Sequence, residues 1–147
     1  MKVRWYIILF FAASAMVALS GCGRFKLGNQ IGIPTAQIAI GDRSLTYDQV
    51  THLWTLAFTL NAYNLPGSAG GTINSFNLKN GQKLTAGLYI TDCPPKAQEN
   101  CGPFAVNYSI SFASYPPVGS YVITGYEATG QNGKFMTIDL ATPLVIH

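Results

Sequence analysis

The residues with the widest chemical range in this 147-residue chain are its three cysteines, Cys22, Cys93 and Cys101. A cysteine thiolate can be alkylated, can bind a metal ion, or can join a second cysteine in a disulfide. Zinc binding is disfavoured because zinc sites use four ligands, and the chain offers two histidines, His52 and His147. The spacing of Cys93 and Cys101 is not the C-x-x-C of thiol redox enzymes. The cysteines therefore indicate covalent modification or a disulfide, and no metal site is predicted.

The sequence that precedes Cys22 has the features of an export signal. Lys2 and Arg4 form a short positive segment, and residues 5–19 carry no charge. This run is shorter than the roughly 20 residues that a helix needs to span a bilayer core, and it fits the apolar region of a signal peptide. The segment ends in Leu19-Ser20-Gly21-Cys22, which resembles the lipobox of bacterial lipoproteins. The resemblance implies a signal peptide over residues 1–21, a diacylglyceryl group on Cys22, and acylation of the new amino terminus with a chain such as palmitate.

Two alternatives stay open for this segment. Ala13-Ser14-Ala15 has the A-x-A form of an ordinary signal peptidase site, although it lies inside the apolar run. An uncleaved membrane anchor is the second alternative.

A lipid on Cys22 would hold the protein to a bacterial membrane without a transmembrane helix. Each buried methylene contributes about 0.8 kcal/mol, and two or more chains anchor a protein firmly. The next residue is Gly23 rather than aspartate. By resemblance to enterobacterial lipoproteins, this implies the outer membrane, facing the periplasm or the cell surface. Residues 22–34 are rich in glycine and predict a flexible tether, which leaves residues 35–147 as a single β-rich domain.

Cys93 and Cys101 remain as an even pair once Cys22 is lipidated. Exported proteins meet oxidising conditions, in which such a pair forms a disulfide. We therefore expect a disulfide that closes the loop 93–101 and stabilises the fold by about 2–3 kcal/mol in the chain-entropy account. The closed loop could be preorganised for binding, or it could only stabilise a connection between strands.

Most of the chain after residue 35 alternates hydrophobic and polar side chains with a period of two, which is typical of half-buried strands. Strands are expected near 36–41, 45–50, 53–63, 72–79, 83–91, 104–113, 119–128 and 134–146. Asn80-Gly81 and Asn132-Gly133 predict type I′ hairpin turns. Seven or eight short strands at this spacing predict an antiparallel β-sandwich, for which an immunoglobulin-like layout is one arrangement.

Residues 46–63 are the ambiguous segment. Thr46 and Gln49 could form a helix capping box. Against that, Leu56 and Phe58 alternate with polar or small residues, and β-branched threonines suit strands better than helices. We expect strand here, and the alternative is an α+β fold with a helix at 46–63 packed on an antiparallel sheet.

No sequence motif indicates catalysis. The chain has no G-x-S-x-G elbow, and the glycine-rich run 67–71 lacks the Lys-Ser/Thr ending of a phosphate loop. His52 is the one plausible base, and the six acidic residues show no paired spacing. A net charge of +3 without a basic stripe disfavours nucleic-acid binding. The sequence therefore predicts no catalytic residues, no cofactor and no nucleic-acid partner.

The composition describes a folded, exported module. Hydrophobic residues make up 48% of the chain and charged residues 10%, which is unlike a disordered protein. We expect a noncatalytic envelope or cell-surface binding or accessory module, held to the membrane through Cys22, with an envelope protein as partner. A carbohydrate or small-ligand binder is the first alternative, because tyrosine-rich faces can bind sugars. The tyrosines considered for such a face are Tyr63, Tyr115, Tyr121 and Tyr126. An envelope enzyme with an unrecognised site is the second alternative.

Overall fold

The computed structural model describes residue 32, residues 34–96 and residues 101–147. The predicted signal peptide and Cys22 lie outside these residues. Within the described part, all regular secondary structure is strand, and seven strands follow one another along the chain. They are β1 (Ala36–Asp48), β2 (Leu53–Asn64), β3 (Gly71–Leu78), β4 (Lys83–Ile90), β5 (Cys101–Phe112), β6 (Val122–Gly130) and β7 (Phe135–Val145).

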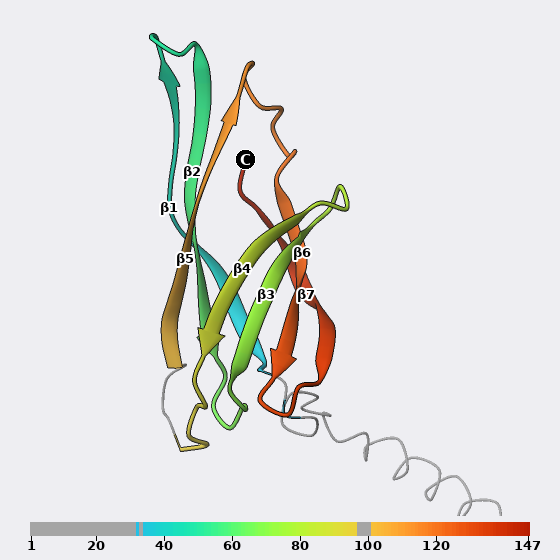
Figure 1. The fold of residues 1–147 in the computed structure, drawn as a ribbon. Helices are drawn as coiled ribbons and strands as arrows, with labels where there is room; N and C mark the ends of the chain where they lie inside the picture. Colours follow the sequence, from blue (N-terminus) through green and yellow to red (C-terminus); the bar gives the residue numbers. More distant parts are fainter. Residues whose placement is uncertain (1–31, 33, 97–100) are drawn as a thin grey trace, which may run out of the picture.

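The strands form two antiparallel sheets that pack face to face, so the domain is a β-sandwich, as predicted (Figure 1). One sheet has the order β1-β2-β5 and the other the order β4-β3-β6-β7. In the constant-type immunoglobulin layout the fourth strand lies in the same sheet as the first, second and fifth. Here β4 pairs with β3 instead. The position of β4 is thus the one departure of these strands from that layout.

Residues 46–63 form the end of β1, a hairpin turn and most of β2, so the helical alternative is wrong. In the turn, the Asp48 carboxylate accepts a hydrogen bond from the backbone N–H of Val50 at 2.8 Å. His52 completes the turn with a φ of 55°. Every second side chain of β2 from Leu56 onward is buried. A strand places these side chains on one face against the opposite sheet, whereas a helix would have spread them around its circumference.

β1 is one long strand where the sequence predicted two. The expected segments 36–41 and 45–50 are joined through an irregularity between Ile40 and Arg43, opposite an uninterrupted part of β2. A bulge adds a residue to one strand and bends it without ending the sheet, which the alternating pattern did not reveal.

The two Asn-Gly pairs lie in the hairpins β3–β4 and β6–β7, as predicted, but the turn type differs. Among the described residues other than glycine, only His52 has a positive φ, so neither asparagine adopts the type I′ conformation. Gly81 N–H instead donates to the Leu78 carbonyl at 2.9 Å, and Gly81 has a φ of 86°. This is a type I turn followed by a left-handed glycine, the usual three-residue hairpin loop. Gly133 repeats the arrangement in the second hairpin, with a φ of 76°.

The inner faces of the two sheets make the core, in which Tyr126 of β6 is fully buried. Its hydroxyl accepts a hydrogen bond from the backbone N–H of Ala36 at 2.9 Å, at the start of β1. Burial raises the pKa of the Tyr126 hydroxyl, which keeps it neutral. This contact fixes where β1 enters the sandwich. The largest buried side chains around it are Phe76, Leu56, Leu60, Ile73, Ile90, Ile123 and Ile146.

The sandwich has two different ends. β1 enters at one end with Ala36 and finishes at the other with Asp48, about 40 Å away at the rise of an extended strand. The β2–β3 and β4–β5 connections lie at the entry end. At the far end, the β1–β2 hairpin and the tip of β5 extend past the β3–β4 hairpin (Figure 1). The inner face of the three-stranded sheet is therefore not covered by the second sheet at this far end.

Candidate functional site

The uncovered end of the three-stranded sheet carries a row of aromatic side chains. Tyr47 of β1 is paired with Trp54 of β2, and Trp54 is paired with Phe112 of β5. The adjacent row, one inward-facing step along the strands, is Leu45, Leu56 and Ile110. Because inward-facing positions alternate along each strand, both rows lie on the face that elsewhere forms the core. The same pattern that fills the core thus places rings at the end of the sandwich.

Tyr47, Trp54, Tyr115 and His147 form a chain of touching rings, which we call the aromatic end. The Tyr47 and Trp54 ring centroids are 5.1 Å apart, and those of Trp54 and Tyr115 are 5.0 Å apart in an edge-to-face arrangement. The His147 ring lies 5.4 Å from that of Tyr115. Each such aromatic pair stabilises by about 0.5–1.5 kcal/mol beyond the area it buries. The rings therefore hold one another in place while their outer edges stay accessible.

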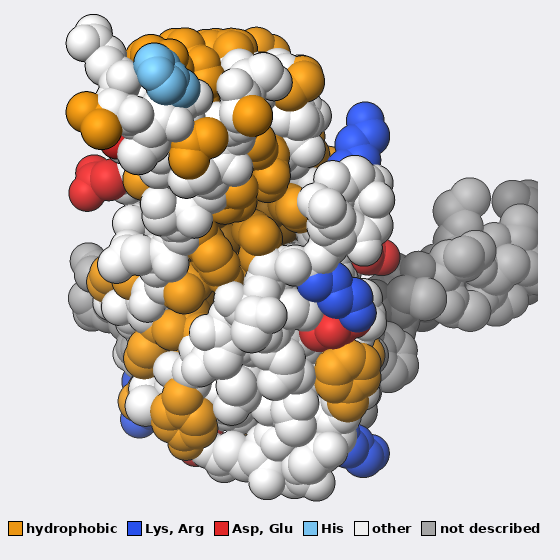
Figure 2. Space-filling model, turned by 45° about the horizontal axis from the view of Figure 1, so that its top comes forward, with side chains coloured by type: hydrophobic (Ala, Val, Ile, Leu, Met, Phe, Trp, Pro, Cys, Tyr) orange, Lys and Arg blue, Asp and Glu red, His pale blue; other side chains and the backbone are white. Residues whose placement is uncertain are grey.

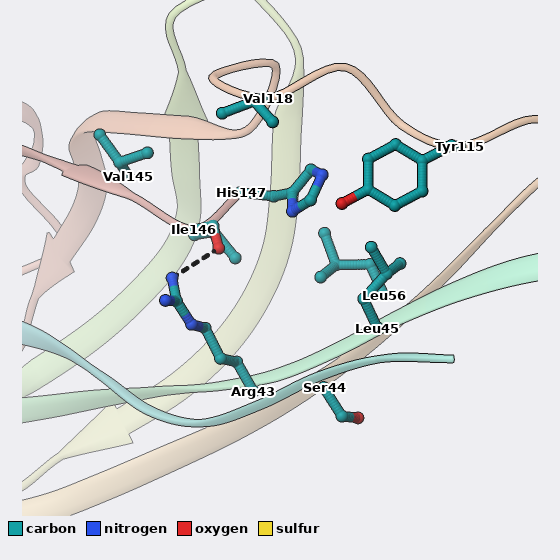
Figure 3. A pocket seen from close by; sticks show the side chains of 9 residues that line it. All are labelled: Arg43, Ser44, Leu45, Leu56, Tyr115, Val118, Val145, Ile146 and His147. Carbon is teal, nitrogen blue, oxygen red and sulfur yellow. Dashed lines mark hydrogen bonds between the residues drawn. The ribbon is translucent and has the colours of Figure 1, made fainter. Parts of the chain in front are cut away.

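A cavity of about 450 Å³ opens beside the aromatic end (Figure 3). Most of its lining is apolar, and the polar side chains in it are Arg43, Ser44 and His147. The apolar lining residues are Leu45, Leu56, Tyr115, Val118, Val145 and Ile146. This size and this composition, apolar walls with a few polar groups, are typical of sites that take a ligand or an anchoring side chain.

Ile146 and His147 follow β7 and form one wall of the cavity, and hydrogen bonds hold this wall in place. The Arg43 guanidinium donates to the Ile146 carbonyl at 3.0 Å, which ties this segment to β1 (Figure 3). The Ile146 N–H donates to the Tyr121 carbonyl at 2.8 Å. A His147 ring nitrogen lies 2.9 Å from the Pro116 carbonyl. This wall of the cavity is therefore held by three hydrogen bonds, one between backbone groups and two from side chains to backbone carbonyls.

Large apolar side chains are exposed around the cavity mouth. Val118 is 79% exposed and Tyr115 52% exposed, although both lie in the loop between β5 and β6 that also contributes the cavity wall. Val145, on the β7 side of the cavity, is 53% exposed. Clustered exposed apolar side chains on a domain surface are typical of a binding surface.

His52 has a hydrogen-bond partner in the adjacent strand, Tyr47 of β1. It lies at the tip of the β1–β2 hairpin, where its Nδ1 is 3.2 Å from the Tyr47 hydroxyl. Within the described residues, no group of three or more histidine, cysteine or acidic side chains could hold a metal ion. Of the two histidines, His147 belongs to the aromatic end, and His52 contacts the hydroxyl of Tyr47.

Three acidic side chains have structural partners. Asp48 holds the hairpin turn, and hydrogen bonds from that turn lower the pKa of its carboxyl group, the largest contribution coming from the Val50 N–H. The Glu127 carboxylate pairs with the Lys83 ammonium group, which lowers the pKa of Glu127. The Asp92 carboxylate accepts a hydrogen bond from the Gln131 side chain at 3.0 Å. These carboxylates stabilise turns and strand pairs.

Cys93 and Cys101 form a disulfide at the entry end of the sandwich. Around it, the Asn64 side chain donates to the carbonyls of Ala69 at 3.1 Å and Thr91 at 2.7 Å. The Gly67 N–H donates to the Cys93 carbonyl at 2.9 Å. These bonds join the β2–β3 and β4–β5 connections, which favours the stabilising role of the disulfide over a role in binding.

The tyrosines considered for a binding face have separate roles. Tyr126 is buried in the core, and Tyr121 packs edge-on against Phe112 with ring centroids 5.6 Å apart. Tyr63 is half-buried in β2, opposite Gln37. Tyr115 alone of the four belongs to the aromatic end. Sequence reasoning missed Tyr47 and His147, and the signal that could have found Tyr47 was its place beside Trp54 once residues 46–63 were treated as a hairpin.

No family model and no curated protein sequence matches this chain. Within residues 34–96 and 101–147 there is no helix with the length and hydropathy needed to cross a membrane. The case for function therefore rests on the site and on the N-terminal motif.

Proposed function

We propose that this chain is a lipid-anchored, noncatalytic binding module of the bacterial envelope, and that its aromatic end binds a protein partner. The Leu19-Ser20-Gly21-Cys22 motif supports the anchor. The domain enters the sandwich at Ala36, and the aromatic end lies at the opposite end of β1. An anchor that precedes Ala36 leaves the aromatic end unobstructed.

The observation that carries the proposal is the apolar cavity beside exposed rings. Binding hot spots in protein interfaces are enriched in tryptophan, tyrosine and arginine. Here Tyr115 and Arg43 line one cavity, and Trp54 packs against Tyr115. A cavity with mostly apolar walls accepts an apolar side chain from a partner and excludes water from it. The ligand that fits best is thus a protein segment with a large hydrophobic anchor residue.

Site-specific photo-crosslinking in intact cells tests this proposal. A photoreactive residue at Val118, on the cavity mouth, should crosslink to one defined protein. The matched control is the same residue at Thr137, which is exposed on β7 and lies away from the aromatic end. Adducts of the same protein from both positions, or no adduct from Val118, would contradict the proposal.

A carbohydrate ligand is the second candidate, favoured by the three rings of Tyr47, Trp54 and Tyr115. Sugars stack on exposed aromatic faces, which give apolar area with a polar edge. Trp54 is the one tryptophan beyond residue 5, so its fluorescence reports directly on this site. Titration of the detergent-solubilised protein with envelope glycans should change this emission if sugars bind, and a flat titration would leave the protein ligand as the explanation.

A further inference from the structure

The four edge strands of the two sheets differ in how they are protected against pairing with another chain. An unprotected edge exposes a row of unpaired backbone groups, and proteins usually block such an edge with charges, prolines or bulges. The edge strand β1 has the irregularity before Arg43, together with Asp42. β4 begins with Lys83 and shifts register opposite β3. β7 contains Asp139 and Pro143 and also shifts register.

β5 has none of these devices along residues 104–112. This run pairs with β2 over nine consecutive positions, from Phe104 opposite Ala62 to Phe112 opposite Trp54. Its other edge has no neighbouring strand among the described residues. The run contains no proline and no charge, and no charged residue occurs between positions 101 and 126. Pro103 and a register shift opposite β2 lie at the start of β5, and the run 104–112 after them is a long, regular and uncharged edge.

The sequence of this edge is nearly palindromic: read in either direction, it places side chains of similar kind at the same positions. Residues 104–112 read Phe-Ala-Val-Asn-Tyr-Ser-Ile-Ser-Phe, with Tyr108 at the centre. If two copies pair in antiparallel fashion about Tyr108, side chains of similar kind lie opposite each other. On the inner face the pairs are Phe104 with Phe112, Val106 with Ile110, and Tyr108 with Tyr108; on the outer face they are Ala105 with Ser111, and Asn107 with Ser109.

The inner-facing side chains of β5 are also incompletely covered. All of them are only half-buried, whereas their neighbours on β2 are buried from Leu56 onward. In Figure 2 hydrophobic side chains form a band down the face on which β4 and β5 lie in front. A strand added beside β5 would place its own inner-facing side chains against this band. Aromatic and β-branched pairs opposite each other are the combinations that stabilise antiparallel sheets.

We infer that β5 is an interface for a second copy of this chain. Two β5 strands pair in antiparallel fashion about a twofold axis at Tyr108 and join the two three-stranded sheets into one sheet of six strands. In a twofold interface the same surface patch of the two copies meets, so the patch must be complementary to itself. Like charges must not lie opposite each other in it. The run 104–112 is uncharged and nearly palindromic, so it meets both requirements.

The dimer is compatible with an open aromatic end. In the antiparallel arrangement the two long axes run in opposite directions, so the two aromatic ends point apart, and Tyr47, on β1 at the other edge of the sheet, lies away from the interface. The segment between Cys22 and Pro34 has a contour length of at most about 43 Å, since each of its 12 residue steps spans at most about 3.6 Å. Both copies can therefore reach one leaflet when the dimer lies along it.

The oligomeric state of the detergent-solubilised lipoprotein tests the interface. Light scattering should give the wild-type protein the mass of two chains, after subtraction of detergent. Asn107→Lys/Ser109→Lys puts lysines opposite each other across the axis and should halve that mass. Ser44→Lys/Thr46→Lys adds the same charge to β1, the other edge of the same sheet, and should leave the dimer intact. A single-chain mass for the wild type, or equal dissociation of the two variants, would overturn the inference.

Crosslinking tests the register without relying on the folding of the lysine variants. Asn107→Cys and Ser109→Cys proteins are prepared separately, then oxidised alone and as a mixture. Opposite residues in an antiparallel pair have Cα atoms about 4.5–5.5 Å apart, which suits a disulfide, whereas identical positions in the two copies are diagonal and farther apart. Several-fold more linked dimer in the mixture supports pairing about Tyr108. Equal or absent crosslinking in all samples overturns it.

Discussion

The Trp54 ring meets the Tyr115 ring edge-on, with the centroids 5.0 Å apart, and this contact joins β2 to the loop that follows β5. Trp54 is held from its other side by Tyr47, the residue paired with it in β1. The contact thus links the sheet to the loop that forms the cavity wall. If the loop moves away from Trp54, the cavity loses one side.

A double-mutant cycle measures this link. Trp54→Leu and Tyr115→Leu should show a coupling free energy of about 0.5–1.5 kcal/mol in urea unfolding, as expected for an edge-to-face pair. The control cycle combines Trp54→Leu with Tyr89→Leu, a change at an exposed tyrosine of β4 in the opposite sheet. The control should show no coupling, and a zero value for the Trp54–Tyr115 cycle would contradict the role assigned to the contact.

Tyr126→Phe should lower the free energy of unfolding by about 1–3 kcal/mol. The substitution keeps the buried ring and removes the hydroxyl that accepts from the Ala36 N–H, which leaves a buried donor without its partner. Urea denaturation of the variant measures the loss. Tyr89→Phe, at an exposed ring, is the control and should change the stability little. An equal effect of both substitutions would mean that the Ala36 contact contributes nothing.

Removal of the disulfide should destabilise the fold without unfolding it. Cys93→Ser/Cys101→Ser should lower the free energy of unfolding by about 2–3 kcal/mol, because the unfolded chain gains the freedom of the open loop. Reduction of the wild-type protein should raise its intact mass by about 2 Da as two thiols form. An unchanged mass after reduction would show that the bond is absent from the isolated protein.

Cys22→Ala should abolish incorporation of labelled palmitate. The thiol of Cys22 is the group that the lipobox resemblance assigns to lipid attachment. Cys93→Ser/Cys101→Ser is the matched control and should still incorporate the label. Continued labelling of Cys22→Ala would exclude the anchor.

Glu127 should contribute to stability in a pH-dependent way. The hydrogen bond from Lys83 lowers the pKa of the Glu127 carboxyl group in the folded protein, so the folded state favours the ionised form. Its contribution is present above the ordinary glutamate pKa of about 4.3, and it disappears as the pH falls through the lower folded-state value. The stability difference between wild type and Glu127→Gln should therefore shrink on acidification. Urea unfolding of both proteins across this pH range measures the stability difference. A stability difference that does not change with pH would contradict the role of the ionised Glu127.

The sequence predicted the β-sandwich because hydrophobic periodicity is a local property. In Leu84–Ile90 and Val106–Phe112, alternate side chains must face the same way, so the strands and their inner faces can be read directly. Asn-Gly located both hairpins. Their turn type was not predictable, because the dipeptide is compatible with more than one loop geometry and strand pairing selects among them.

By itself, the sequence determined the strand pattern, the pairing of Cys93 with Cys101, and the Leu19-Ser20-Gly21-Cys22 motif from which a lipid anchor is predicted. The tertiary structure decided which strands are edges and which rings meet. Tyr47, Trp54, Tyr115 and His147 come from separate parts of the chain, and they touch because the first sheet extends past the second. Likewise, the self-matching sequence at 104–112 becomes a candidate interface because β5 pairs on one side alone. Periodicity reports which way a side chain faces, whereas the packing of the two sheets decides whether anything covers it.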